Sequence, residues 1–260
     1  MFHNKGAIAA FLQMKSRDRT GGNAAESKHR AKSVKMLFVT AHLAAHVKNI
    51  DARNMDYWRI ASELQSQAPA RFLPPKPVTN EDDESDGTGS YLIDSVDRIF
   101  FCGDLNYRVD LPREITDNSI LKMERLLKAG DTESLKKVEE LRLSMLMHDQ
   151  LLQVLSQGAA FPGFAEGKIT FMPTFKFDKD TNDYDTSHKQ RIPAWTDRVL
   201  FKPIGTRVLE YKSEADCRSS DHRPVHATFR VSTVGREIAA PKKGTRSKRS
   251  RKPSTKKQSD

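Results

Sequence analysis

Two short apolar runs that each end in polar side chains constrain the fold of this chain more than any other feature. Residues 34–41, VKMLFVTA, are β-branched and apolar and predict a buried strand, with His42 at its carboxyl end. Residues 95–105, SVDRIFFCGDL, predict a second strand, and Asp104 and Asn106 crowd its end. Strands that end in such groups carry them to the loop-bearing edge of a sheet, so a functional site is expected there.

Other elements follow from periodicity and from helix-breaking residues. Apolar residues at helical spacing predict a helix over 49–65, and the prolines that begin at Pro69 end it. The leucine-rich sequence of 120–157 predicts two helices, with Gly130 and Asp131 between them. We also expect polar loops or insertions at 17–33 and 78–90, and short strands at 168–172, 197–202, 207–211 and 224–232. Because strands outnumber long helices, the pattern favours a layered α/β or α+β fold.

The positive charge of the chain is concentrated at its carboxyl end. The net charge is +10 over 260 residues, but residues 236–260 contain ten Lys or Arg and two acids, a net of +8. The remainder carries only +2, so the overall charge says little about the partner of a folded domain. Residues 233–260 have few apolar side chains and are expected to be disordered. This tail could attach to anionic membranes, act as a nuclear import signal or RNA contact, or have no dedicated role.

Composition disfavours membrane-spanning and disulfide-rich proteins. No apolar run approaches the ~20 residues that a membrane-spanning helix needs, and the first residues lack the apolar core of a secretory signal. The two cysteines, Cys102 and Cys217, form neither a disulfide framework nor a zinc pattern, and neither stands in the context of a catalytic nucleophile. We therefore expect a cytoplasmic protein in a reducing compartment.

Four polar clusters stand at predicted strand boundaries: TAHLAAH at 40–46, GDLNYR at 103–108, RIPAWTDRVL at 191–200 and SSDHRPV at 219–225. Each has an ordinary structural explanation when taken alone, such as an Asx turn, a helix cap or a local ion pair between Asp197 and Arg198. His42 and His46 are four residues apart and could bind zinc from one helix face, but no third ligand stands at a set spacing from them.

Taken together, the clusters contain the groups that hydrolysis of a phosphate ester needs. An Asp can orient and deprotonate a water molecule, and an Asn or a His can donate hydrogen bonds to phosphoryl oxygens. An Asp behind a His fixes the tautomer of the ring and keeps it charged. A hard cation such as Mg²⁺, held by carboxylates, neutralises developing charge. The combination therefore indicates metal-assisted hydrolysis of a phosphate.

The same clusters resemble the inositol polyphosphate 5-phosphatases, members of the wider fold that includes DNase I and the apurinic endonucleases. Further matching text is NKGAIA at 4–9, RNMDYWRI at 53–60 and FPGFAEGKITFMPTFKFDKDTNDYDTSHKQRIPAWTDRVL at 161–200, in the family's order. The resemblance implies a four-layered α/β/β/α sandwich of the endonuclease/exonuclease/phosphatase type over residues 1–232. The family's first strands and its main magnesium-binding Glu have no counterpart in this sequence, so we expect a partial domain.

The resemblance also implies catalytic roles for individual residues. Asp104 would activate the attacking water, and Asn106 would hold that water or a phosphoryl oxygen. His222 would donate to the scissile 5-phosphate and would be oriented by Asp197. His42 would contact the same phosphate from the other side.

Substrate-binding roles are implied for five further residues. Asn4 and Lys5 would contact the scissile phosphate. Lys176, Lys189 and Arg191 would bind a neighbouring 4-phosphate, and their positive charges suit that task.

Three more positions complete the comparison with the family. Asp221 would lie beside the metal, which we expect to be Mg²⁺. Phe175 stands where the family usually has a tyrosine, so a hydroxyl that could bind the 4-phosphate is absent. Thr196 replaces the usual cysteine between Trp195 and Asp197, which we expect to alter packing.

The sequence therefore predicts a metal-dependent hydrolase that removes the 5-phosphate from a phosphoinositide, such as phosphatidylinositol 4,5-bisphosphate, or from a soluble inositol polyphosphate. A nuclease of the same superfamily is one alternative, although the cations expected at the 4-phosphate argue against nucleic acid as the partner. A catalytically weak fragment that binds phosphorylated head groups is another. We expect a location at the periphery of membranes through the basic tail, with the nucleus as the alternative; the oligomeric state is open.

Overall fold

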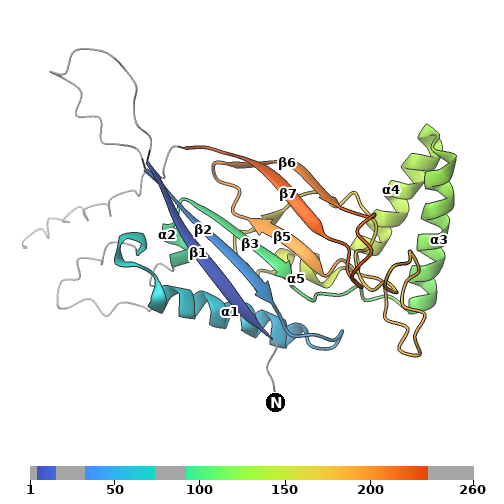
Figure 1. Ribbon diagram of the computed structural model, residues 1–260, viewed down its shortest axis with the longest axis horizontal. Helices are drawn as coiled ribbons and strands as arrows, with labels where there is room; N and C mark the ends of the chain where they lie inside the picture. Colours follow the sequence, from blue (N-terminus) through green and yellow to red (C-terminus); the bar gives the residue numbers. More distant parts are fainter. Residues whose placement is uncertain (1–4, 16–32, 74–91, 234–260) are drawn as a thin grey trace, which may run out of the picture.

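The computed structural model describes residues 5–15, 33–73 and 92–233 (Figure 1). Its strands are β1 (Gly6–Lys15), β2 (Ser33–His42), β3 (Arg98–Asp104), β4 (Ala165–Glu166), β5 (Asp197–Phe201), β6 (Thr206–Ser213) and β7 (Val225–Val231). Its helices are α1 (Ile50–Gln67), the 3₁₀ turn η1 (Ala70–Phe72), α2 (Leu92–Ser95), α3 (Arg113–Ala129), α4 (Thr132–Leu146) and α5 (Gln150–Gln157). Asn4 and the predicted loop at 78–90 lie outside the described residues, as do nearly all of the predicted insertion at 17–33 and of the basic tail.

Five strands form one mixed sheet in the order β1-β2-β3-β5-β4. β1 runs antiparallel to β2, and β2 runs parallel to β3. β5 is antiparallel to both of its neighbours, β3 and β4. β6 and β7 form a separate antiparallel pair. The parallel pairing of β2 with β3 requires a long crossover, and the connection between these two strands contains α1.

The register of the sheet places polar residues in one row. His42 pairs with Asp104 across β2 and β3, and Asp104 pairs with Asp197 across β3 and β5. Gly6 at the start of β1 lies opposite His42. The parallel strands β2 and β3 end at this edge and the antiparallel β5 begins there, so segments distant in sequence meet at one row.

Helices cover one face of the five-stranded sheet (Figure 1). Leu37 and Val39 of β2 are fully buried on this face, as the two-residue period of a strand expects. Tyr57 of α1 packs its ring 5.9 Å from that of Phe101 of β3 and 4.1 Å from that of Phe161, measured between centroids. This core therefore holds β2 and β3, the two strands that deliver His42 and Asp104.

The opposite face is covered only in part by the β6–β7 pair. The ring of Phe229 on β7 lies 4.9 Å from that of Phe100 on β3 and 5.0 Å from that of Phe201 on β5. Near β1 the same face is exposed to solvent: Ile8 is 73% exposed and Phe38 is 40% exposed. The described residues thus form three layers: helices, the five-stranded sheet and the two-stranded sheet.

The expected α/β class with two packed sheets is confirmed, and the described residues supply three of its four layers. The strands predicted near 34–41, 95–105, 197–202, 207–211 and 224–232 correspond to β2, β3, β5, β6 and β7, and the helix predicted at 49–65 is α1. Of the helices described, none is long and apolar enough to cross a membrane.

Two predictions about secondary structure were wrong. The break predicted at Gly130 and Asp131 is confirmed, since Gly130 caps the end of α3 and Asp131 the start of α4. However, the helical region begins at Arg113 and holds three helices. The third is α5, which is capped separately by the Asp149 side chain, the acceptor of a hydrogen bond from the Leu152 N–H at 3.0 Å. Residues 168–172 form no strand. There the carbonyl of Phe171 accepts a hydrogen bond from the indole N–H of Trp195 at 3.2 Å, and the short strand β4 lies just before this segment.

Gly103 lets β3 pass close to β2 beside the polar row. Its φ is 127°, and a Cβ built on it would lie 2.1 Å from the carbonyl oxygen of Ala41. We expect Gly103→Ala to lower the free energy of unfolding by about 3 kcal/mol or more, because the new methyl group clashes with backbone and the φ angle is strained. Urea denaturation followed by circular dichroism measures this loss.

Gly6→Ala is the matched control for that experiment. Gly6 lies at the same edge of the sheet, but a Cβ built on it meets no atom within 4 Å. Gly6→Ala should therefore leave stability nearly unchanged. Equal losses in the two variants would contradict the role given to Gly103.

Candidate active site

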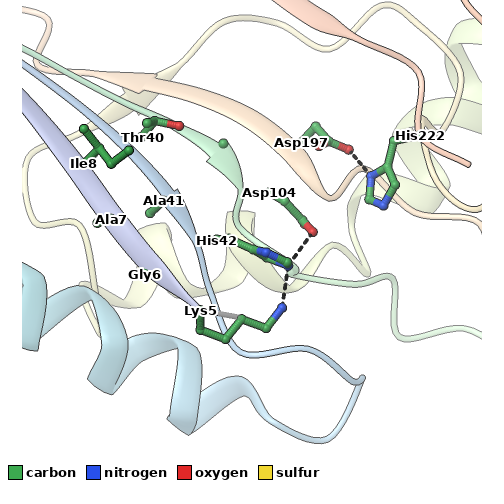
Figure 2. A pocket seen from close by; sticks show the side chains of 11 residues that line it. Lys5, Gly6, Ala7, Ile8, Thr40, Ala41, His42, Asp104, Asp197 and His222 are labelled. Carbon is green, nitrogen blue, oxygen red and sulfur yellow. Dashed lines mark hydrogen bonds and ion pairs between the residues drawn. The ribbon is translucent and has the colours of Figure 1, made fainter. Parts of the chain in front are cut away.

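The polar row opens onto a cleft of about 680 Å³ (Figure 2). Its titratable lining consists of Lys5, His42, Asp104, Asp197 and His222. These side chains come from five places in the chain: the start of β1, the ends of β2 and β3, the start of β5 and the loop before β7. The structure therefore brings together all four of the predicted catalytic acids and histidines and one of the predicted phosphate contacts.

His222 and Asp197 form a hydrogen-bonded pair. The Nδ1 atom of His222 lies 2.8 Å from Oδ2 of Asp197. Thr196 donates its hydroxyl to the same carboxylate oxygen at 3.0 Å. Burial of the ring opposes protonation, but the hydrogen bond and the charge of Asp197 outweigh burial and raise the pKa of His222. The pair therefore keeps a proton donor in the cleft at higher pH than an ordinary histidine would.

Asp104 is held by the backbone and side chain that follow it. Leu105 turns the chain, and Asn106 adopts a left-handed conformation with φ of 58°. In this geometry the Asn106 backbone N–H donates to Oδ1 of Asp104 at 3.1 Å, and its side-chain amide donates to Oδ2 at 3.0 Å. The DLN sequence thus forms a tight turn whose amide and carboxylate face each other.

Arg108 fixes the amide of Asn106 from behind. Its Nη2 donates to Oδ1 of Asn106 at 2.6 Å, and its Nε donates to the backbone carbonyl of Asn106 at 3.1 Å. With Oδ1 occupied by a guanidinium, the Asn106 amide presents its N–H groups to Oδ2 of Asp104 and to the carbonyl of Leu43, each at 3.0 Å. Burial lowers the pKa of Arg108 to about 10, which leaves it charged at neutral pH.

The carboxyl group of Asp104 is less acidic than an ordinary aspartate. Burial raises its pKa and the negative charge of Asp197 adds to this effect, while His222, His42 and Arg108 oppose it. A raised pKa makes the carboxylate a stronger base, provided that it is ionised at the working pH.

His42 lies between an acid and a cation. Its Nε2 atom is 3.2 Å from Oδ2 of Asp104 and is also contacted by the ammonium group of Lys5 (Figure 2). This nitrogen accepts from Lys5 or donates to Asp104, according to the tautomer of the ring. Burial lowers the pKa of His42, so the ring is neutral at neutral pH.

Asp104, Asp197 and His222 are also close enough to share a metal ion. One ligand atom from each lies within 4.8 Å of the others. Asp221, the predicted metal neighbour, is not in this group; its Oδ2 lies 3.3 Å from Nζ of Lys176. His46 is likewise outside the group. The two carboxylates supply the oxygen atoms that a hard cation prefers.

The predicted 4-phosphate residues lie on the loop between β4 and β5, and Asp185 organises that loop. The backbone N–H of Asp185 donates a hydrogen bond to the backbone carbonyl of Lys176 at 2.9 Å. The Asp185 carboxylate accepts from the Arg191 N–H at 2.7 Å and from the Ser187 hydroxyl at 2.6 Å. Lys189, in the turn between them, is exposed. Buried Asp185 therefore ties the two ends of the cationic segment together.

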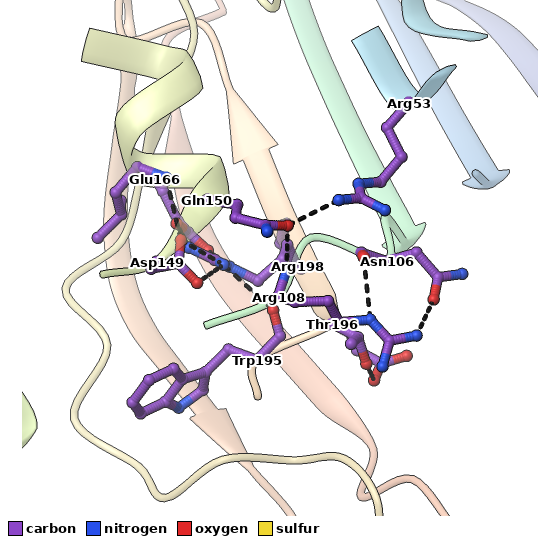
Figure 3. Close-up of polar contacts among 12 residues, drawn as sticks. Arg53, Asn106, Arg108, Asp149, Gln150, Glu166, Trp195, Thr196 and Arg198 are labelled. Carbon is purple, nitrogen blue, oxygen red and sulfur yellow. Dashed lines mark hydrogen bonds and ion pairs between the residues drawn. The ribbon is translucent and has the colours of Figure 1, made fainter. Parts of the chain in front are cut away.

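A buried ion cluster lies beneath the site (Figure 3). Arg198, next to Asp197, donates from Nη1 to Asp149 at 2.9 Å and from Nε to Glu166 at 2.6 Å. The Arg198 and Asp149 side chains are fully buried, and that of Glu166 is 3% exposed. The local ion pair between Asp197 and Arg198, considered from the sequence, does not form. Arg198 instead anchors β5 to the cap of α5 and to β4.

Sequence reasoning missed three residues that shape the site: Asp149, Glu166 and Asp185. Asp149 stands directly before a leucine-rich helical run, which is a capping signal. Asp185 is followed two residues later by Ser187, a pattern typical of an Asx turn. No signal in the sequence identifies Glu166, because its partner Arg198 is 32 residues away along the chain.

Comparisons with known proteins agree with the geometry. The Endonuclease/Exonuclease/phosphatase family 2 pattern matches residues 1–228. The mouse type II inositol 1,4,5-trisphosphate 5-phosphatase is 33% identical over 193 residues, which are 74% of this chain and 16% of that protein. The phosphatidylinositol 4,5-bisphosphate 5-phosphatase INP51 of Saccharomyces cerevisiae (strain ATCC 204508 / S288c) is 35% identical over 193 residues, again 74% of this chain and 16% of that protein.

A solved structure shows the same similarity to 5-phosphatases. The inositol polyphosphate 5-phosphatase domain of SPsynaptojanin, in complex with inositol (1,4)-bisphosphate and a calcium ion, matches with a TM-score of 0.57 and 31% identity. The match covers 87% of this chain and 51% of that domain. The chain thus spans about half of the solved domain and a smaller share of the two curated relatives. The similarity to 5-phosphatase catalytic domains that the motifs predict is confirmed.

Asp197→Asn should lower the pKa of His222, because only the weaker effects of Asp104 and Asp221 then oppose burial. The raised pKa of His222 in the folded state stabilises the protein at pH values below the ordinary histidine pKa of about 6.5, and this contribution is lost as the pH rises through the raised pKa. The variant should lose this part of the pH dependence. NMR titration of the His222 ring protons measures the pKa. Asp221→Asn, which removes a charge but not the hydrogen bond, should have the smaller effect; the reverse order would contradict the assignment.

Arg198→Met should destabilise the fold by about 3–5 kcal/mol, because it leaves the carboxylates of Asp149 and Glu166 buried without a counter-charge. The urea midpoint measures the loss. Arg207→Met is the matched control, since Arg207 lies on the exposed face of β6 and its loss should cost less than about 0.5 kcal/mol. A small effect of Arg198→Met would show that the cluster is not essential for stability.

Proposed function

The chain belongs to the Endonuclease/Exonuclease/phosphatase family 2, and from this membership we propose that it forms part of an enzyme that hydrolyses the 5-phosphate of phosphoinositides or soluble inositol polyphosphates. The observation that carries the proposal is the row His42–Asp104–Asp197, with His222 hydrogen-bonded to its end. The relatives named above support a phosphate monoester as the substrate. One of them is named for a soluble inositol phosphate and the other for a lipid.

Asp104 is the proposed general base. Its raised pKa and its place in the cleft suit it to take a proton from a water molecule that attacks phosphorus. The Asn106 amide, held by Arg108, keeps the carboxylate oriented. To donate to the water or to a phosphoryl oxygen, it would give up its hydrogen bond to Asp104 or to the Leu43 carbonyl. This arrangement needs no covalent intermediate on the protein.

His222 is the proposed proton donor to the phosphate. Asp197 holds its Nδ1 side, so the other ring nitrogen is left to face the substrate. Neutral His42 and the ammonium group of Lys5 would contact the same phosphate from the β1–β2 side. Hydrogen bonds and positive charge at these points stabilise the charge that builds on the phosphoryl oxygens in the transition state.

Mg²⁺ is the cofactor that we propose. Asp197 would be its oxygen ligand in the cluster of described residues, and Asp104 would stay free to act as the base, because a bound cation would lower the pKa of that carboxylate. When bound, such a cation neutralises charge on the phosphate. The calcium ion in the solved relative supports a divalent cation at this kind of site.

Lys176, Lys189 and Arg191 are the proposed contacts to a neighbouring 4-phosphate. The loop held by Asp185 carries all three, and an arginine fork and two ammonium groups match phosphate oxygens. Lys176 is paired with Asp221 in the structure, so the phosphate would compete with that carboxylate.

The location and the membrane contact of the enzyme are also proposals. We propose a cytoplasmic enzyme, which a lipid substrate would bring to a membrane surface. A basic segment such as residues 236–260 would add about 1 kcal/mol per basic residue near an anionic surface.

The test is release of phosphate by the full chain with Mg²⁺. We expect release from inositol 1,4,5-trisphosphate or from vesicles of phosphatidylinositol 4,5-bisphosphate, and none from plain or abasic DNA. Asp104→Asn should reduce the rate by at least about 100-fold, because the base is lost. Asp216→Asn, which makes the same change at a fully exposed acid, should not.

Other results would point elsewhere. Cleavage of DNA in preference to the inositol substrates would identify a nuclease. Binding of the head group without turnover would identify a binding protein. Equal rates for Asp104→Asn and the wild type would remove Asp104 from the mechanism.

A further inference from the structure

Phe175 lies between the two halves of the site. It is 8% exposed, and its backbone bridges to both Ala194 and His222. One side of its ring meets Arg108, which belongs to the turn after β3. Another side meets the ring of His222, which belongs to the loop before β7. No hydrogen bond can come from the phenyl side chain, so its effect on the site must be through packing.

The contact with Arg108 reaches the proposed base through two further contacts. The guanidinium carbon of Arg108 lies 4.3 Å from the centre of the Phe175 ring, a favourable distance for a cation–π interaction. Arg108 holds Oδ1 of Asn106 at 2.6 Å, and the Asn106 amide holds Oδ2 of Asp104 at 3.0 Å. The Phe175 ring thus packs against one face of the Arg108 guanidinium, which holds the Asn106 amide that orients the Asp104 carboxylate.

The contact with His222 reaches the proposed proton donor directly. The centroids of the Phe175 and His222 rings are 4.8 Å apart, and the ring planes are inclined by 49°. The Asp197 carboxylate fixes one edge of the imidazole. This hydrogen bond leaves the imidazole ring free to tilt out of its plane. Packing against the Phe175 ring restricts that tilt.

We propose that Phe175 is a positioning residue that sets Arg108 and His222 relative to each other, and so aligns Asp104 with the histidine across the cleft. The proposal rests on the function proposed above and deepens it. It gives this position a role in placing the catalytic groups, in addition to any contact with substrate.

The shape of the side chain matters because both contacts need a flat ring. A leucine fills a similar space but offers no face for a guanidinium, so Arg108 would lose its cation–π partner. A tyrosine keeps the ring and adds a hydroxyl at its edge. Phe175→Tyr should therefore preserve the positioning, whereas Phe175→Leu should lose it.

Phe177 supplies a matched control two residues along the chain. It is 7% exposed, and the guanidinium carbon of Arg223 lies 3.8 Å from its ring centre. Its other ring neighbour is Tyr184, with centroids 4.2 Å apart. Phe177→Leu therefore removes the same kind of buried ring and arginine contact. No ring contact joins Phe177 to His222, and the arginine on its ring is Arg223 rather than Arg108. Because Arg223 follows His222 directly, this control also reports any effect that reaches His222 through its loop.

The experiment measures kcat and KM for inositol 1,4,5-trisphosphate in the full chain and in these three variants. We expect Phe175→Leu to lower kcat by about 10–100-fold with KM changed less than about threefold, because misplacement of reacting groups acts on the transition state. Phe175→Tyr should keep kcat within about threefold of the wild type, and Phe177→Leu should do the same. Thermal midpoints of the two leucine variants should be similar.

A second measurement does not depend on turnover. Three-bond NMR couplings that report the χ1 rotamers of Asn106 and His222 should become averaged in Phe175→Leu and stay at their wild-type values in Phe177→Leu. These couplings depend on the torsion angle and not on the ring current of the removed phenyl group. Unchanged couplings in Phe175→Leu would overturn the proposal even if the wild type hydrolyses no inositol phosphate. An equal loss of kcat in Phe177→Leu would also overturn it, because the effect would then be one of general stability.

Discussion

The hydrogen-bond register of β2, β3 and β5 is the constraint on which the site depends. It aligns His42, Asp104 and Asp197 in one row, and each of these side chains reaches the cleft only because its neighbours occupy the adjacent strands. A slip of one residue would turn the affected side chain to the opposite face. The buried contacts of β2 and β3 with α1, and the close approach at Gly103, hold that register.

Beneath the row of His42, Asp104 and Asp197, Arg198 on β5 forms ion pairs with Asp149 and Glu166, and these pairs fix the position of β5. The cluster contains two acids and one base, all buried, so its geometry must be exact enough for hydrogen bonds to offset desolvation. Tyr211 of β6 adds a further hydrogen bond to the cluster, because its hydroxyl donates to Oε1 of Glu166 at 2.7 Å. The cluster therefore connects the five-stranded sheet, the cap of α5 and the two-stranded sheet at the residue that follows Asp197.

The sequence predicts the parts of this site whose signals are local. The strands that carry His42 and Asp104 are short apolar runs, and the motifs around Asp197 and His222 are contiguous. The family resemblance supplies the expectation that these four residues meet, since spacing alone gives no distance between residues 42 and 222. Contacts that depend on tertiary structure could not be predicted in this way. Lys176 beside Asp221, Arg198 between Asp149 and Glu166, and Phe175 against Arg108 each join side chains that no local pattern relates.

His42 and His222 have different electrostatic environments, although each of them is paired with an aspartate. His42 and His222 each lie within hydrogen-bond distance of an aspartate, yet their pKa values move in opposite directions. His42 shares its Nε2 with the Lys5 ammonium, and burial prevails, so its ring stays neutral. His222 has Asp197 as a hydrogen-bonded partner, and Asp104 and Asp221 add negative charge around it, so its pKa is raised and the ring keeps its proton to higher pH than an ordinary histidine. Groups whose environments push their pKa values apart can serve as base and acid at one pH. One edge of the sheet thus places Asp104, a carboxylate with a raised pKa, between an imidazole whose pKa is lowered and one whose pKa is raised, which is the polarity that the proposed transfer of a proton from water and donation to phosphate would require.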